Sequence, residues 1–291
     1  MDKFGDVELT IDLLALPFVQ TALLAAAILG VVAGVIGPLI VRRQMAFAVH
    51  GTAELGFTGA AAALLLGVGV EYGAVAGAVV AALALGLLGA KASERDSVIG
   101  VVLSFGLGLG VLLLWFYEGR ASSKLGLLFG QVITVDSANL TVFAGSAVLV
   151  LGVLAVIYRP LLFASVDPVV AAARGVPLRV LTPLFAVLVG IATALGVQTV
   201  GVLLVLALLV TPAAAACRVT SSPFVATVLS IVFAEVAVLG GIVLSLAPGA
   251  PISAFVTSIS FVIYLACRLV EWARSRVTGR VPQPVSAPAS R

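Results

Sequence analysis

Long apolar stretches alternate with short polar segments along almost the whole chain. A helix that crosses a lipid bilayer needs about 20 apolar residues. The pattern predicts such helices near residues 17–41, 45–67, 72–90, 98–117, 138–158, 179–197, 199–217, 223–245 and 252–270. The sixth and seventh stretches are separated only around Gly196–Gly201, so the prediction is nine membrane helices, with eight as the alternative. The predicted fold class is therefore all-α, a polytopic bundle of membrane helices.

The composition supports a membrane protein and excludes a water-soluble domain. Hydrophobic residues make up 62% of the chain and charged residues only 10%, with a mean hydropathy of +1.27. A soluble domain carries roughly 25% charged residues. The two cysteines, Cys217 and Cys267, fit neither a disulfide framework nor a thiolate metal cage. The net charge of +3 indicates no nucleic-acid partner, because basic residues in a membrane protein mark its cytoplasmic side.

The basic residues also predict how the chain crosses the membrane. With the N-terminus outside, 13 of the 16 Lys and Arg residues fall in segments on the cytoplasmic side. This asymmetry favours an outside N-terminus, a cytoplasmic C-terminus and an odd number of crossings. The acidic start of the chain lacks a signal-peptide pattern. We expect an extracytoplasmic segment at 1–16, a transmembrane domain at 17–270 and a disordered, Pro/Ser-rich cytoplasmic tail at 271–291.

Three pairs of glycines, each four residues apart within a predicted helix, indicate close helix packing. They are Gly30/Gly34, Gly73/Gly77 and Gly106/Gly110. Small residues at this spacing let two helix backbones approach closely in lipid. They predict contacts between helices and carry no chemistry of their own.

Three ionisable residues lie where the hydrocarbon core is expected. Glu54 lies about ten residues, or roughly 15 Å, into the second predicted helix, and Glu235 lies midway along the eighth. A charge at this depth costs at least about 2.5–3.5 kcal/mol, so such residues usually face a cavity or a partner. His50, the only histidine, shares a helix face with Glu54.

The His50 and Glu54 side chains have two possible roles. Imidazole nitrogen and carboxylate oxygen are ligands for zinc and other first-row divalent metals. Alternatively, the two side chains form a buried hydrogen-bonded pair. Glu235 is equally compatible with a transport role and with a protonated interhelical hydrogen bond.

The polar segment 158–179 predicts a short helix on the cytoplasmic side. Asp167 can cap such a helix and Pro168 suits its first position. Gly175 and Pro177 can end it. The segment is either a plain amphipathic connector or a lever that docks into another protein. Because no GxxxxGK[ST] motif occurs in the chain, any ATPase that drives transport must be a separate subunit.

Five blocks in order resemble the integral-membrane permease of divalent-metal ABC importers, the zinc, manganese and iron class. They are the opening stretch at 18–47, ERDSVIGVVLSFGLGLGVLLL at 94–114, LLFGQVITV at 127–135, DPVVAAARGVP at 167–177 and VGVLLVLALLVTPAAAA at 200–216. The resemblance implies an importer built from two permease subunits, two cytoplasmic ATPases and an extracellular metal-binding protein. It also implies that DPVVAAARGVP is the coupling helix, with Asp167, Pro168, Arg174, Gly175 and Pro177 at the ATPase contact.

The second predicted helix departs from the family pattern M-G-D-A-L-S-H-A-x-L-P-G. The matching block here is MAFAVHGTAELGFTG, which places His50 at the usual Asp position and Glu54 at the usual His position. The ligand types are therefore kept in swapped order, and Thr58 stands where the family has Pro. One imidazole and one carboxylate still share a helix face.

The function that follows is the permease of an ATP-driven importer of divalent metal, zinc or manganese, in a bacterial plasma membrane. His50 and Glu54 would form a transient metal station between two permeases, with Glu235 as a lesser candidate in the same pathway. The chain would bind no cofactor of its own and would not be an enzyme, since a partner subunit uses the ATP. The alternatives are a proton-coupled secondary transporter using Glu54 and Glu235, a vitamin B12 or siderophore type of ABC permease, and an assembly or anchoring protein.

Overall fold

Helices make up nearly all of the part of the chain that the computed structural model describes, residues 7–88, 92–119, 137–200, 205–249 and 251–278. They are α1 (Val7–Leu14), α2 (Pro17–Arg42), α3 (Ala46–Leu66), α4 (Val70–Leu88), α5 (Ala92–Phe116), α7 (Ser137–Val166), α8 (Pro168–Ala173), α9 (Leu178–Val200), α10 (Val205–Leu209), α11 (Thr211–Val219), α12 (Pro223–Leu246) and α13 (Ile252–Thr278). These described segments contain no β-strand. The all-α prediction is confirmed.

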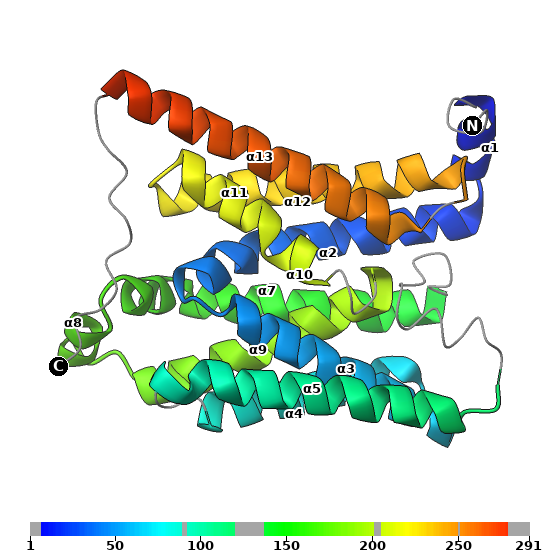
Figure 1. Cartoon of the computed structure of the whole chain (residues 1–291), viewed down its shortest axis with the longest axis horizontal. Coiled ribbons are helices and arrows are strands. Elements are labelled where there is room, and N and C mark those ends of the chain that lie inside the picture. The colour runs from blue at the N-terminus through cyan, green and yellow to red at the C-terminus, as the bar shows by residue number, and fades with distance from the viewer. Residues whose placement is uncertain (1–6, 89–91, 120–136, 201–204, 250, 279–291) are drawn as a thin grey trace.

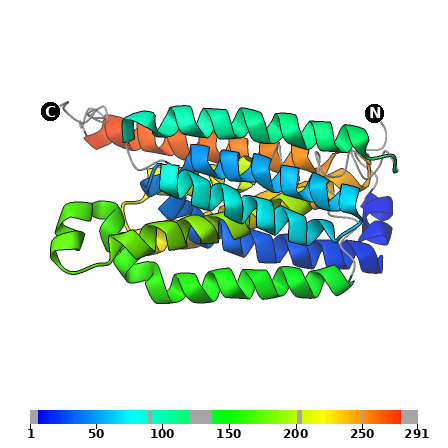
Figure 2. The ribbon, with the colours of Figure 1, turned by 90° about the horizontal axis from the view of Figure 1, so that it is seen from below.

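The long helices lie roughly along one common direction and form a single bundle (Figure 1). α2, α11, α12 and α13 pack together on one side, and α3, α4, α5 and α9 on the other. The short helix α10 contacts both groups, since it packs on α2, α3, α9 and α13. α7 lies along one edge, and α5 and α13 lie along the opposite edge (Figure 2).

Each of the nine predicted stretches coincides with helix. By length and composition, seven described helices could cross a membrane, and two shorter apolar helical segments, Val70–Leu85 and Val205–Val219, accompany them. The seventh stretch is not one helix: it consists of α10 and α11, which are interrupted at Val210 just before Pro212. The number of crossings therefore stays a prediction.

Some helices continue past their predicted ends. α7 runs through Pro160 to Val166, and α9 continues through Gly196 to Val200. α13 continues to Thr278 and so takes in the first residues of the expected tail at 271–291, whose remainder, 279–291, lies outside the described residues. The cause is the same in the three cases: a polar residue or a single Pro or Gly weakens a helix without ending it. The break expected at 196–201 falls partly on 201–204, outside the described residues.

The glycine pairs pack against neighbouring helices, as predicted. A Cβ on Gly34 would lie 2.4 Å from the Ile231 Cα of α12. On the other side of the bundle, Gly73 faces the carbonyl oxygen of Gly59, so no side chain fits between α3 and α4 there. Gly110 on α5 likewise lies against the ring of Phe57 on α3. α3 is therefore held closely between α4 and α5.

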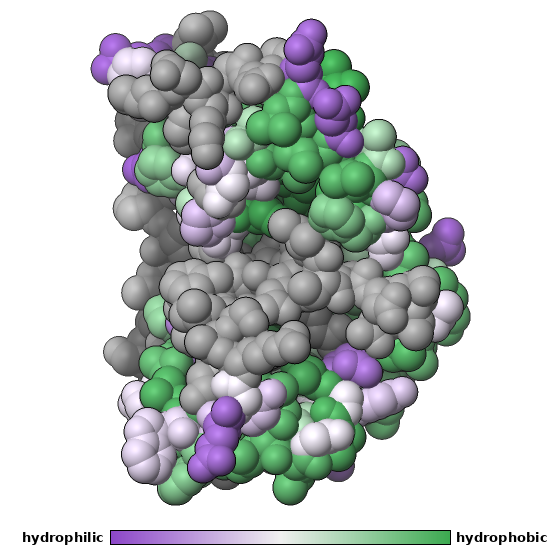
Figure 3. Space-filling model, turned by 90° about the vertical axis from the view of Figure 1, so that its right-hand side faces the viewer, coloured by the Kyte–Doolittle hydropathy of each residue, from purple (hydrophilic) through white to green (hydrophobic). Residues whose placement is uncertain are grey.

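The two ends of the bundle differ in charge. α2 ends at Arg42, α11 ends just after Arg218, and α13 carries Arg276 in its last turn. These helix ends lie on the side of the molecule where α8 projects (Figures 1 and 2). At the opposite end, polar residues are scattered among apolar ones (Figure 3). Arg218 also forms an ion pair of 2.8 Å with Glu271 of α13, which joins two helix ends.

Candidate functional site

His50 and Glu54 lie one turn apart in the first half of α3. The helix begins after Met45 and ends at Gly67, which has a left-handed backbone with φ of +70°. Alanine and glycine occupy much of its buried surface, so neighbouring helices can approach its polar side chains closely. His50 is half-buried, whereas the Glu54 residue is only 2% exposed. Two ionisable groups thus share a helix inside an apolar bundle.

α5 covers the region around Glu54. A Cβ on Gly106 would lie 3.3 Å from the Glu54 Cβ, which is tighter than an ordinary contact, so the glycine eases the close approach of α5. The Thr58 hydroxyl donates to the Gly106 carbonyl oxygen at 2.5 Å and lies 2.9 Å from that of Glu54. Thr58, which stands where the family pattern has proline, therefore links α3 to α5 by a hydrogen bond beside Glu54.

Two polar atoms of this pair lack a hydrogen-bond partner. They are Nδ1 of His50 and Oε2 of Glu54, and both atoms are buried. No hydrogen bond or ion pair joins these two described side chains, so a mutually satisfied pair does not account for them. Buried polar atoms are nearly always paired, and an orphaned atom points to a missing water or ion. Within the described residues no cluster of three or more His, Cys, Asp or Glu side chains forms a complete metal site.

Glu235 lies elsewhere, at the contact between α12 and α2. A Cβ on Gly30 would lie 2.6 Å from the Glu235 Oε1, and this buried oxygen has no hydrogen-bond partner. α12 packs on α2, α11 and α13, whereas α3 packs on α4, α5 and α9. The structure therefore does not bring Glu235 together with His50 and Glu54.

The predicted short helix is present as α8, between α7 and α9. The Asp167 Oδ1 accepts hydrogen bonds from the Val169 and Val170 backbone N–H groups at 3.0 and 2.9 Å, and Pro168 starts the helix. Gly175, with φ of +83°, follows its end. Val169 is 77% exposed although it is apolar. The local prediction is confirmed, and the exposed apolar surface at this end of the bundle is compatible with a partner.

Sequence reasoning missed three polar residues that hold α3 in place. Thr52, between His50 and Glu54, lies against Thr193 of α9 with the two hydroxyl oxygens 3.4 Å apart, and both residues are buried. Arg43, just before α3, donates to the Ser165 hydroxyl of α7 at 3.3 Å. No local motif marks these residues, because their partners are more than 100 residues away in the chain.

A family model settles how this helix arrangement is classified. The model of the ABC 3 transport family matches residues 15–271. The chain belongs to the ABC 3 transport family. A curated relative in the family, the manganese transport system membrane protein MntC of Halalkalibacterium halodurans, is 34% identical over 80% of this chain and 80% of its own. The MntC protein of Listeria innocua is 33% identical over 85% of this chain and 90% of its own.

Solved structures agree with membership of the ABC 3 transport family. PsaBC from Streptococcus pneumoniae, solved in complex with Fab, superimposes with a TM-score of 0.83 and is 25% identical, covering 92% of this chain and 98% of that one. An inward-facing putative metal-chelate type ABC transporter matches less well, with a TM-score of 0.66 at 19% identity and 86% coverage of both chains, and shows the fold alone. The block LLFGQVITV lies outside the described residues.

Proposed function

We propose that this chain is the permease subunit of an ATP-driven importer of divalent metal ions, with manganese as the first cargo to test and zinc as the second. The observation that carries this proposal is the pair of buried, unpartnered polar atoms on His50 and Glu54. Family membership and relatives named for manganese transport support it.

The donor set of the proposed station suits an ion in transit. One imidazole and one carboxylate can replace part of the hydration shell of a divalent cation. A resident structural metal is usually held by a closed set of four protein ligands, which releases it slowly. A pathway needs sites that bind well enough to admit the ion and weakly enough to release it. Two ligands on one helix meet that requirement. The carboxylate of Glu54 would also offset part of the positive charge of the metal ion.

The energy for import comes, in this proposal, from a separate ATPase that contacts α8. Asp167, Pro168, Arg174, Gly175 and Pro177 build or end this short helix and would form the coupling contact. An extracytoplasmic metal-binding protein would deliver the ion, and a second copy of the permease would complete the pathway by alternating access. The distribution of Lys and Arg places the N-terminus outside a bacterial cell and the C-terminus in its cytoplasm in this proposal.

The deciding experiment is uptake of Mn²⁺ and Zn²⁺ into vesicles that contain the permease together with its ATPase and binding protein. We expect ATP-dependent uptake by the parent. His50→Ala and Glu54→Gln should each lower it at least about tenfold, which corresponds to about 1.4 kcal/mol of lost stabilisation of the passing ion.

Glu118→Gln is the matched control for Glu54→Gln, because Glu118 is an exposed acid just after α5. It should transport like the parent. If both station variants also transport like the parent, the metal-station role is wrong. Uptake driven by a proton gradient without ATP would instead favour a secondary transporter, and uptake of metal chelates but not free ions would favour a siderophore-type permease.

A further inference from the structure

We propose that Arg43 is the positioning residue that connects the coupling helix α8 to the metal station on α3. This inference rests on the proposed function, since it assigns the route by which ATPase movements at α8 reach His50 and Glu54. Arg43 follows the last residue of α2 and lies three residues before the start of α3.

The Arg43 guanidinium bridges the two helices that carry α8. One nitrogen donates to the Ser165 hydroxyl, one residue before the end of α7, and another donates to the Thr182 hydroxyl in the first turns of α9. Both bonds are 3.3 Å long, and the guanidinium carbon lies 5.5 Å from the ring centre of buried Phe185. A movement of α8 relative to the bundle must therefore act on Arg43 from both sides.

A second contact joins α9 to α3 further along the bundle, at the station itself. Thr193 donates to the Val189 carbonyl oxygen of its own helix at 2.7 Å, and Thr52 likewise donates to that of Val49 at 2.8 Å. The two hydroxyl oxygens are 3.4 Å apart. Thr52 lies between the two station residues, so α9 packs here against the part of α3 that carries them.

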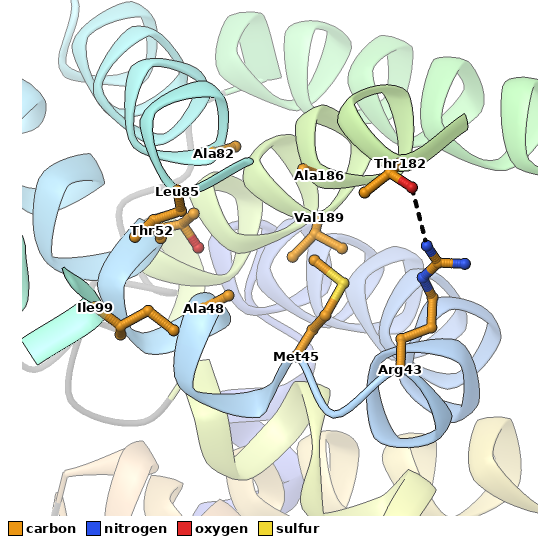
Figure 4. A pocket seen from close by; sticks show the side chains of 10 residues that line it. All are labelled: Arg43, Met45, Ala48, Thr52, Ala82, Leu85, Ile99, Thr182, Ala186 and Val189. Atoms are coloured by element: carbon orange, nitrogen blue, oxygen red, sulfur yellow. Dashed lines mark hydrogen bonds between the residues drawn. The ribbon is translucent and has the colours of Figure 1, made fainter. Parts of the chain in front are cut away.

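A partly open cavity of about 130 Å³ lies between these two connections (Figure 4). Its wall includes Met45, Ala48 and Thr52 on the α3 side and Ala186 and Val189 on the α9 side, with Arg43 at one end. Tightly packed helices pass a movement from one to the next, but they cannot shift where no space is left between them. Here the cavity gives the two helices space to shift, while the Arg43 hydrogen bonds and the packing of Thr193 on Thr52 couple a shift of α9 to α3.

Arginine is required for this role because its planar guanidinium presents several donors in a fixed fork. Lysine keeps the positive charge, but its single ammonium cannot hold hydroxyls on two helices in the same geometry. The substitution Arg43→Lys therefore separates bridging from charge. Arg159 serves as the control site, since it is an exposed arginine on α7.

The test measures Mn²⁺ imported per ATP hydrolysed by the reconstituted importer. We expect Arg43→Lys and Arg43→Ala to lower this ratio at least about fivefold, the scale of one or two lost hydrogen bonds, while the complex still hydrolyses ATP. Arg159→Ala should keep the parent ratio. Equal ratios for Arg43→Lys and the parent would overturn the proposal.

A second readout does not depend on transport. Spin labels at Phe47→Cys on α3 and Val180→Cys on α9, both exposed positions, report the distance between these helices once Cys217→Ala and Cys267→Ala remove the native thiols. We expect one narrow distance distribution in the parent and a broader one in Arg43→Lys. An unchanged distribution would contradict the bridging role. If the parent imports no metal, the proposed function fails, but the label distances still decide whether Arg43 joins the helices.

Discussion

Two acids inside this bundle have different surroundings, and the difference favours different roles for them. Glu54 lies beside His50, next to the threonine contacts that hold α3 to α5 and α9. Glu235 lies against the backbone of Gly30, on helices that do not include α3. The sequence left a transport role and an interhelical hydrogen bond open for Glu235. Its separate location places Glu235 outside the site formed by His50 and Glu54.

The variant Glu235→Gln tests this assignment. An amide has the shape of the protonated acid and fits against Gly30, so we expect Mn²⁺ uptake within about twofold of the parent and no loss of thermal stability beyond about 0.5 kcal/mol. Glu54→Gln, measured in the same vesicles, should lose uptake. Loss of uptake in Glu235→Gln with normal stability would return Glu235 to the metal pathway.

For single residues, the sequence predicts which types occur and how they are spaced, but not which residues they contact in the fold. The shared helix face of His50 and Glu54 follows from their separation by four residues. That α5 covers Glu54 does not follow, because the contact depends on how two helices pack. Arg43 illustrates the same limit: in the sequence it is one more basic residue near a helix end, and only its Ser165 and Thr182 partners distinguish it.

At the level of helices, hydropathy predicts where they lie better than where they end. The nine predicted stretches all coincide with helix, because the apolar run itself determines the element. Ends depend on local chemistry that competes with tertiary packing. Pro160 does not end α7, whereas Pro212 follows an actual interruption at Val210. The α8 boundaries were predictable because Asp167 and Gly175 act locally.

The cap of α8 provides a prediction about coupling. Asp167→Ala removes the acceptor for two backbone N–H groups and should destabilise the short helix by about 1 kcal/mol. We expect weaker association with the ATPase subunit and a lower rate of ATP-driven uptake. Binding of the purified ATPase to the permease in lipid discs measures the first effect.

Asp167→Asn is the control that separates capping from charge, since Asn caps a helix about as well as Asp. It should bind the ATPase like the parent if the carboxylate acts only as a cap. Weak binding by both variants would mean that the negative charge itself contacts the partner, and normal binding by both would exclude a role for the cap.

The whole molecule is asymmetric from end to end, and this asymmetry predicts its orientation in the membrane. Arginines gather at the end where α8 projects, and α1 lies at the other end (Figure 1). The positive-inside rule places the α8 end in the cytoplasm. Charge counting along the sequence leads to the same orientation, provided that the number of crossings is odd.

Labelling of single cysteines tests this orientation. With Cys217→Ala and Cys267→Ala as background, we expect Ile11→Cys on α1 to react with a membrane-impermeant maleimide in intact cells. Val169→Cys on α8 should react only in inverted vesicles. Both chosen positions are exposed in the bundle, at 60% and 77%. The reverse pattern would invert the topology, and reaction of both from one side would require an even number of crossings between residues 11 and 169.

The close approach of Gly59 and Gly73 has a practical consequence. Because no side chain separates α3 from α4 at this point, we expect the two helices to move together, so that a rotation of the helix that bears Glu54 also displaces α4. Val80 of α4 is 63% exposed. A fluorophore attached there would report movement of α4 by its fluorescence and would leave His50 and Glu54 unchanged.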